Sequence, residues 1–200
     1  MKSTTNLLRG ILLSAGCFFM LLNACAQNWD INTLRKINPD NPNSDFWETT
    51  SGSAYVFSVG IPIGTWVHGT VHKNRNTQIK AYEMVGSLAI AAVITQTLKI
   101  TVDRPRPYQT YDDINANTFI DGESFPSGHT TIAFATATSL ALEYKKWYIT
   151  VPAYAWAAGV GYSRMYLGQH YPSDVIAGAV VGTGSAFLGH WLSNKIFRKK

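Results

Sequence analysis

The chain has 200 residues, of which 46% are hydrophobic and 14% are charged. That length fits one compact domain, and the charged fraction, well below the roughly 25% of an average soluble domain, indicates a membrane protein. The net charge of +5 comes from short Lys and Arg clusters between apolar runs, without the basic stripe and interleaved aromatics typical of nucleic-acid binding. We therefore expect no nucleic-acid partner.

The first 26 residues have the pattern of a secretory signal peptide. A basic N-terminus precedes an apolar core, and Ala24-Cys25-Ala26 has the small-x-small form that signal peptidase cleaves. A lipoprotein signal with lipidated Cys25 is the alternative, although Asn23 suits simple cleavage better. We predict a cleaved segment 1–26 and a single helical domain at 27–200, which contains no cysteine.

Five apolar runs follow, and each predicts a helix: 46–67, 81–98, 130–142, 147–162 and 175–192. They are rich in small residues, as in membrane helices that pack closely, and Gly178 and Gly182 form a small-xxx-small pair. We predict an all-α bundle of about five to six transmembrane helices. Because several runs are shorter than the roughly 20 residues that span a bilayer, a soluble periplasmic helical domain is the alternative.

The charge distribution predicts an orientation in the inner membrane. With a periplasmic start of the mature chain, five spans place three basic segments in the cytoplasm, as the positive-inside rule requires. Their basic residues are Lys73, Arg75, Lys80, Lys145, Lys146, Lys195, Arg198, Lys199 and Lys200. Nearly every Asp and Glu falls on the opposite side, so the polar motifs described next are predicted to face the periplasm.

The first motif runs from Lys99 to Pro107 and contains three cationic residues. Lys99 ends a predicted helix, and two prolines stop that helix, so that Arg104 and Arg106 are presented on a turn. We expect these cations to bind an anion. Snorkelling of charges to the membrane interface is the alternative.

The second motif is Pro126-Ser127-Gly128-His129, directly before a predicted helix. Ser127 is predicted to be the N-cap, and Gly128 would allow a ligand to approach the backbone. Because a helix N-terminus binds anions, this motif is predicted to hold a phosphoryl group that His129 protonates. An ordinary helix start is the alternative.

The third motif comprises Ser163, Arg164, His170 and Asp174. Arg164 offers a bidentate fork to phosphate oxygens. Asp174 lies four residues after His170 and would meet it if one helix included both, leaving the other imidazole nitrogen free as a nucleophile.

In order, Lys-x6-Arg-Pro, Pro-Ser-Gly-His and Ser-Arg-x5-His-x3-Asp resemble the signature of the type 2 phosphatidic acid phosphatase superfamily, and they match it without a departure from Lys99 to Asp174. The resemblance implies the helical bundle shared by membrane lipid phosphatases, soluble bacterial acid phosphatases and vanadium haloperoxidases. It implies five phosphate-binding residues: Lys99, Arg106, Ser127, Gly128 and Arg164. It implies three residues for the chemistry: His129, His170 and Asp174. Arg104 lies outside the matched positions.

These roles predict a metal-independent phosphatase that acts through a phosphohistidine. His170 attacks phosphorus, His129 first protonates the leaving group and later activates water, and Asp174 orients His170. The cations replace a metal, and the sequence pattern indicates no carboxylate cluster that would hold one. The predicted substrate is a lipid phosphate or pyrophosphate in the membrane. Alternatives are a soluble periplasmic acid phosphatase for small phosphomonoesters and, less favoured, a vanadium-dependent haloperoxidase.

Other polar residues receive no role in the predicted chemistry. His68 and His72 are predicted to flank a basic turn, and His190 to pack within a helix. The segment from Tyr108 to Phe125 is long for a connector and is predicted to be a lid or a substrate-selecting loop.

Overall fold

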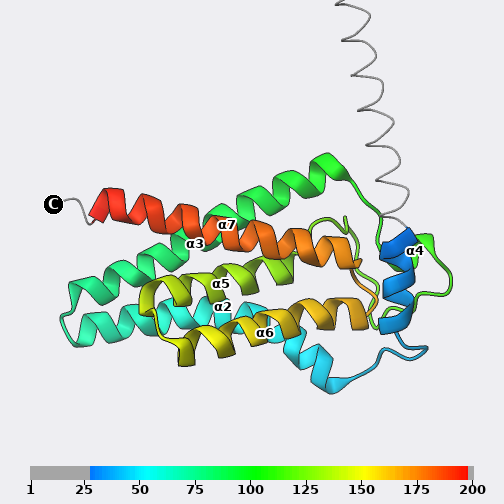
Figure 1. Ribbon diagram of the computed structural model, residues 1–200, viewed down its shortest axis with the longest axis horizontal. Helices are drawn as coiled ribbons and strands as arrows, with labels where there is room; N and C mark the ends of the chain where they lie inside the picture. The colour runs from blue at the N-terminus through cyan, green and yellow to red at the C-terminus, as the bar shows by residue number, and fades with distance from the viewer. Residues whose placement is uncertain (1–27, 198–200) are drawn as a thin grey trace, which may run out of the picture.

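The computed structural model describes residues 28–197, and no strand occurs within that range. A helical segment at 28–37 precedes six labelled helices (Figure 1). These are α2 (Asp45–Val71), α3 (Arg75–Val102), α4 (Pro107–Thr110), α5 (Gly128–Tyr144), α6 (Trp147–Tyr166) and α7 (Pro172–Phe197). The predicted all-α bundle is confirmed. The predicted signal peptide, with the alternative lipidation at Cys25, lies outside the described residues.

Each of the five apolar runs lies inside one long helix, and local signals set where the helices begin and end. The Asn74 side chain accepts a hydrogen bond from the backbone N–H of Thr77 at the start of α3. Lys145 adopts a left-handed conformation with φ of 51° and ends α5. Segment 28–37 and α4 fall outside the apolar runs because only a few of their residues are buried against the bundle.

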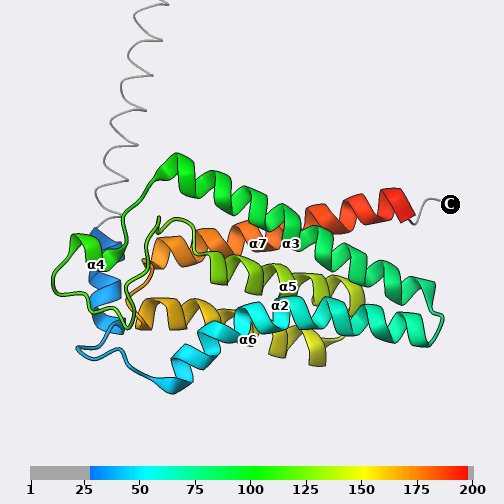
Figure 2. The same cartoon turned by 180° about the vertical axis from the view of Figure 1, so that it is seen from behind.

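The five long helices run in alternating directions, so their ends collect at two poles of the bundle (Figures 1 and 2). One pole, the motif end, carries α4, the segment 103–127 and the turn 167–171. The other pole, the basic end, carries the turns at 72–74 and 145–146 and the last turn of α7. The described residues of the predicted basic segments therefore lie at the pole opposite the three motifs. Arg198, Lys199 and Lys200 lie outside the described residues.

Helix α5 packs against α2, α3, α6 and α7. Small residues permit this packing: a Cβ on Gly178 would lie 2.7 Å from the carbonyl oxygen of Ser127, and one on Gly182 would overlap the carbonyl oxygen of Thr131. The predicted small-xxx-small contact is therefore present between α7 and α5. It holds the start of α7 beside the start of α5, where two of the motifs lie.

Two helical stretches of the described chain are long and apolar enough to cross a membrane: Arg75–Thr110 and Pro172–Phe197. Large apolar side chains are exposed along α2, α3 and α7, among them Val56, Val59, Ile63, Val85, Val93, Val180 and Phe187. Exposed apolar surface of this extent is expected to contact lipid rather than water. The bundle is that of a membrane protein, which favours the transmembrane prediction over the soluble alternative.

Candidate active site

The three sequence motifs meet at the motif end. The backbone N–H of Ser127 donates to the carbonyl oxygen of Asp174 at 3.0 Å, which joins the second motif to the third. Arg106 of the first motif donates from Nη1 to the carbonyl oxygen of Gln169 at 3.2 Å. Gln169 is the residue directly before His170 of the third motif. All eight predicted site residues are thus carried by segments that converge at this pole.

His170 and Asp174 face each other across a turn, with 3.6 Å between His170 Nδ1 and Asp174 Oδ2. No single helix includes both residues, because α7 begins at Pro172, yet the two side chains still meet. Instead, Asp174 Oδ2 accepts the backbone N–H of Tyr171 at 2.9 Å, so the first turn of α7 folds back towards His170. Ser124 completes the contact: its Oγ donates to Asp174 Oδ2 and lies 3.5 Å from His170 Nδ1.

Arg104, which has no equivalent in the family signature, fixes the other oxygen of Asp174. Its Nη1 donates to Asp174 Oδ1 at 2.7 Å, and its Nη2 donates to Asp30 Oδ2 at 2.8 Å. The guanidinium also lies 3.7 Å from the ring centroid of Tyr171. Its charge is therefore shared between two carboxylates, which leaves Arg104 as a support for Asp174 rather than a free cation.

The other three motif cations bond to neutral groups. Lys99 donates to the carbonyl oxygen of Glu123, and Arg106 donates to the carbonyl oxygen of Gly122 at 3.1 Å. Arg164 donates from Nη1 to Ser51 Oγ at 2.7 Å. Within residues 28–197, no carboxylate oxygen lies within 4.0 Å of any of the three cations. The buried Nε of Arg164 also has no hydrogen-bond partner there.

The start of α5 offers further donors for an anion. Ser127 occupies the N-cap position of α5, as predicted, but its side chain makes no capping hydrogen bond. Its hydroxyl instead accepts from Thr130 Oγ1 at 2.9 Å. Because the Ser127 side chain accepts no hydrogen bond from the first backbone N–H groups of α5, these groups, beginning at Gly128, are available to phosphate oxygens.

His129 projects from this helix start towards Tyr55 of α2, with 4.6 Å between the two ring centroids. Burial is the main factor that disfavours a proton on His129, and the charges of Arg164, Arg106 and Lys99 add to it. A bound phosphate dianion would reverse that balance.

His170 is buried in the turn before α7, with 2% of its surface exposed. Burial lowers the pKa of His170 to about 4, against the opposing effect of the nearby Asp174 carboxylate. The imidazole is therefore neutral at physiological pH. Since Asp174 faces Nδ1, the nitrogen that remains for attack is Nε2.

Four residues that no motif singled out contribute to this site: Asp30, Ser51, Tyr55 and Ser124. Ser124 lies at the end of the segment predicted to be a lid or selecting loop, and that end also supplies the carbonyl groups of Gly122 and Glu123. This part of the segment is a wall of the site. Ser51 and Tyr55 are placed by α2, whose sequence carries no recognisable signal for such a role.

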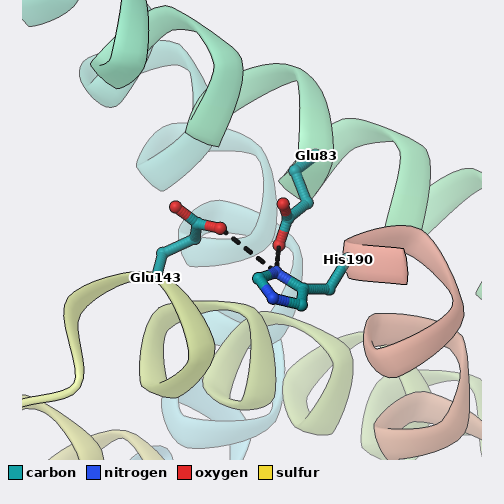
Figure 3. A group of neighbouring side chains, drawn as sticks. All are labelled: Glu83, Glu143 and His190. Atoms are coloured by element: carbon teal, nitrogen blue, oxygen red, sulfur yellow. Dashed lines mark hydrogen bonds and ion pairs between the residues drawn. The ribbon is translucent and has the colours of Figure 1, made fainter. Parts of the chain in front are cut away.

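The other pole holds a group that the sequence pattern did not indicate. Glu83, Glu143 and His190 bring their side chains together there (Figure 3). The expectation that carboxylates form no such cluster is therefore wrong for the basic end. Likewise, His190 is more than a packed helix residue. Residues distant in sequence converge because α3, α5 and α7 pack side by side.

The fold, the converging motifs and the comparisons together define a helical membrane phosphatase. Residues 80–198 match the model of the PAP2 superfamily, and the chain belongs to that family. It is accordingly a phosphoric ester hydrolase, as the resemblance implied.

Two curated relatives have lipid A phosphatase names. The lipid A 4'-phosphatase of Bacteroides thetaiotaomicron is 27% identical over 84% of this chain and 79% of its own. The lipid A 1-phosphatase of Porphyromonas gingivalis is 47% identical over 38% of this chain, but the match spans only 17% of that protein.

Two solved structures share the fold, each with a TM-score of 0.68. Aquifex aeolicus LpxE is 25% identical and is matched over 82% of this chain and 95% of its own. The transmembrane phosphatidylglycerolphosphate phosphatase of Bacillus subtilis is 23% identical, with 94% and 98% covered, and supports the fold alone.

Proposed function

We propose that this protein hydrolyses a phosphate or pyrophosphate group of a membrane lipid through a phosphohistidine on His170, at the periplasmic face of the inner membrane. The two lipid A phosphatase names make lipid A the first substrate to test. Undecaprenyl diphosphate is the second, because a further relative, from Sulfolobus acidocaldarius, is named an undecaprenyl-diphosphatase and is 34% identical over 52% of this chain. The basic end lies opposite the site, which supports a periplasmic active site through the positive-inside rule.

The uncompensated cations carry this proposal. Burying a charge without a counter-ion is costly, so Lys99, Arg106 and Arg164 converging on neutral partners predict an anionic ligand. Arg106 and Arg164 are 7% and 5% exposed. Phosphoryl transfer spreads negative charge over the equatorial oxygens, and three positioned cations stabilise that charge.

The geometry supports a two-step reaction. In the first step Nε2 of His170 attacks phosphorus, the bond from phosphorus to the lipid oxygen breaks, and His129 donates its proton to that oxygen. In the second step neutral His129 takes a proton from water, the hydroxide attacks phosphorus, and the bond to His170 breaks to release inorganic phosphate. Asp174 holds His170 in position and stabilises its positive form.

A lipid substrate is further supported by the rim of the motif end. Phe119 and Ile120 are 80% and 40% exposed in the segment that forms a wall of the site. Tyr108 holds this rim in place: its hydroxyl donates to the carbonyl oxygen of Ile120 at 2.7 Å. Exposed apolar side chains at the rim of the site would contact the acyl chains of a lipid whose phosphate group is bound.

The decisive experiment measures phosphate release by the purified full-length protein from lipid A, undecaprenyl diphosphate, phosphatidylglycerophosphate and a water-soluble phosphomonoester. The matched variant is His170→Ala, and His68→Ala is the control because His68 lies on an exposed face of α2. We expect a lipid to be preferred, His170→Ala to be inactive and His68→Ala to be unchanged. Equal release by His170→Ala would contradict the mechanism, and preference for the soluble ester would contradict the lipid substrate.

A further inference from the structure

A second polar cluster lies at the basic end of the bundle. It consists of Glu83 from α3, Glu143 from α5 and His190 from α7 (Figure 3). Fourteen helical residues separate His129 from Glu143, about 21 Å along α5 at 1.5 Å per residue. The cluster is therefore independent of the phosphate site.

Both carboxylates are buried and approach the same nitrogen. Nδ1 of His190 lies 2.7 Å from Glu83 Oε1 and 3.3 Å from Glu143 Oε1, and the two glutamate side chains are 0% and 1% exposed. Glu83 and Glu143 also interact with each other. Three potential ligand atoms from three helices therefore face one point, and a cation with several coordination positions can contact all three at once.

Lys80 contributes one positive charge at the edge of the cluster. Its Nζ lies 3.9 Å from Glu143 Oε2 and donates to the carbonyl oxygen of Glu143 at 2.9 Å. Lys80 therefore contacts one carboxylate oxygen of Glu143, Oε2, and the other oxygen, Oε1, faces His190. The ammonium group of Lys80 lies outside the three converging atoms.

Helices α7 and α3 approach each other closely beside the cluster. A Cβ on Gly189, the residue before His190, would overlap the side chain of Ser87 on α3. This close approach of α7 to α3 fixes the distance between His190 and Glu83. Three ligands on three packed helices form a more precise site than ligands on loops.

We propose that Glu83, Glu143 and His190 bind a zinc ion that joins α3, α5 and α7. One imidazole nitrogen and two carboxylate oxygens are a ligand set that zinc uses, with a fourth position for water. The three ligand atoms lie within 4.8 Å of one another. Zinc–ligand bonds of about 2.0–2.2 Å place tetrahedral ligands roughly 3.4 Å apart, which small side-chain rotations achieve. The ion takes the place of the proton between His190 and Glu83.

The test uses full-length protein purified without a histidine tag, in detergent, after treatment with a chelator. His68 and His72 are also close, with 4.5 Å between ring centroids, so both are first changed to Asn to remove a competing surface site. Equilibrium dialysis against zinc should give about one ion per chain. Glu83→Gln and His190→Asn in the same background should each weaken zinc binding about tenfold or more.

Phosphatase activity provides the control for folding, because the cluster lies at the other pole. A variant that keeps activity and loses zinc supports the site. Should the variants fail to fold, X-ray absorption of zinc in the parent background decides: one imidazole nitrogen with two or three oxygens supports the proposal. The proposal is overturned if the parent background binds no zinc, if active variants bind zinc as tightly as the parent, or if the spectrum shows two or more imidazoles.

Discussion

Arg104 Nη1 lies 2.7 Å from Asp174 Oδ1, and this bond links a residue outside the family signature to the carboxylate that we propose orients His170. The opposite oxygen of Asp174 accepts from the backbone N–H of Tyr171 and from Ser124. Both carboxylate oxygens of Asp174 therefore accept hydrogen bonds from the protein without substrate. His170, the proposed nucleophile, lies beside a network in which Arg104 contributes the charge.

Arg104→Gln is expected to lower kcat about tenfold to hundredfold and to leave KM nearly unchanged. The loss of one charged hydrogen bond, about 1.5–3 kcal/mol, loosens Asp174 without removing a phosphate contact. Steady-state kinetics with the preferred substrate measure the effects on kcat and KM separately. Arg104→Lys should recover part of kcat, whereas a large rise in KM at unchanged kcat would mean that Arg104 binds substrate directly.

Arg164→Gln is expected to reduce kcat/KM about tenfold to hundredfold, because a phosphate oxygen would lose a charge-assisted hydrogen bond. Arg35→Gln is the matched control: Arg35 pairs with Asp113 at 2.6 Å, and both side chains are about half exposed. An exposed ion pair contributes little, so this variant should stay within about twofold of the parent. Equal losses in the two variants would remove the case for Arg164 as a phosphate ligand.

The pH dependence of kcat/KM should show an acid limb set by His170. Burial lowers the pKa of His170 to about 4, so the neutral nucleophile persists down to that pH and is lost by protonation below it. The nearby Asp174 carboxylate raises the pKa of His170, so the residual activity of Asp174→Asn should have its acid limb at lower pH. Substrate ionisation affects both profiles equally. A limb that moves to higher pH in Asp174→Asn would contradict this assignment.

Gly182→Ala is expected to destabilise the bundle by about 1–3 kcal/mol, because the new methyl group overlaps the carbonyl oxygen of Thr131. Gly184 lies two residues away on the same helix, and a methyl group added there would meet no atom within 4 Å, so Gly184→Ala is the matched control. That change should be neutral or stabilising by up to about 1 kcal/mol. Thermal unfolding in detergent compares the two; equal midpoints would contradict the close contact of α5 and α7.

The parts of this fold that the sequence predicts are those with a local physical signal. Apolar runs give five helices, and prolines and glycines at their ends bring His129 and His170 to one pole. Ser51 and Tyr55 had no such signal, because their role depends on how α2 packs beside α5 and α6. Long-range packing is also what unites Glu83 and His190, which are 107 residues apart.

The covalent intermediate is the central claim, and trapping it is the most direct test. Protein mixed with a radiolabelled phosphorylated lipid and quenched in base within the first turnover should carry label that is stable in base and released by acid, as expected for phosphohistidine. Peptide mapping should locate the label on His170, and His170→Ala should carry none. Turnover without any labelled protein, or label retained in His170→Ala, would contradict the account.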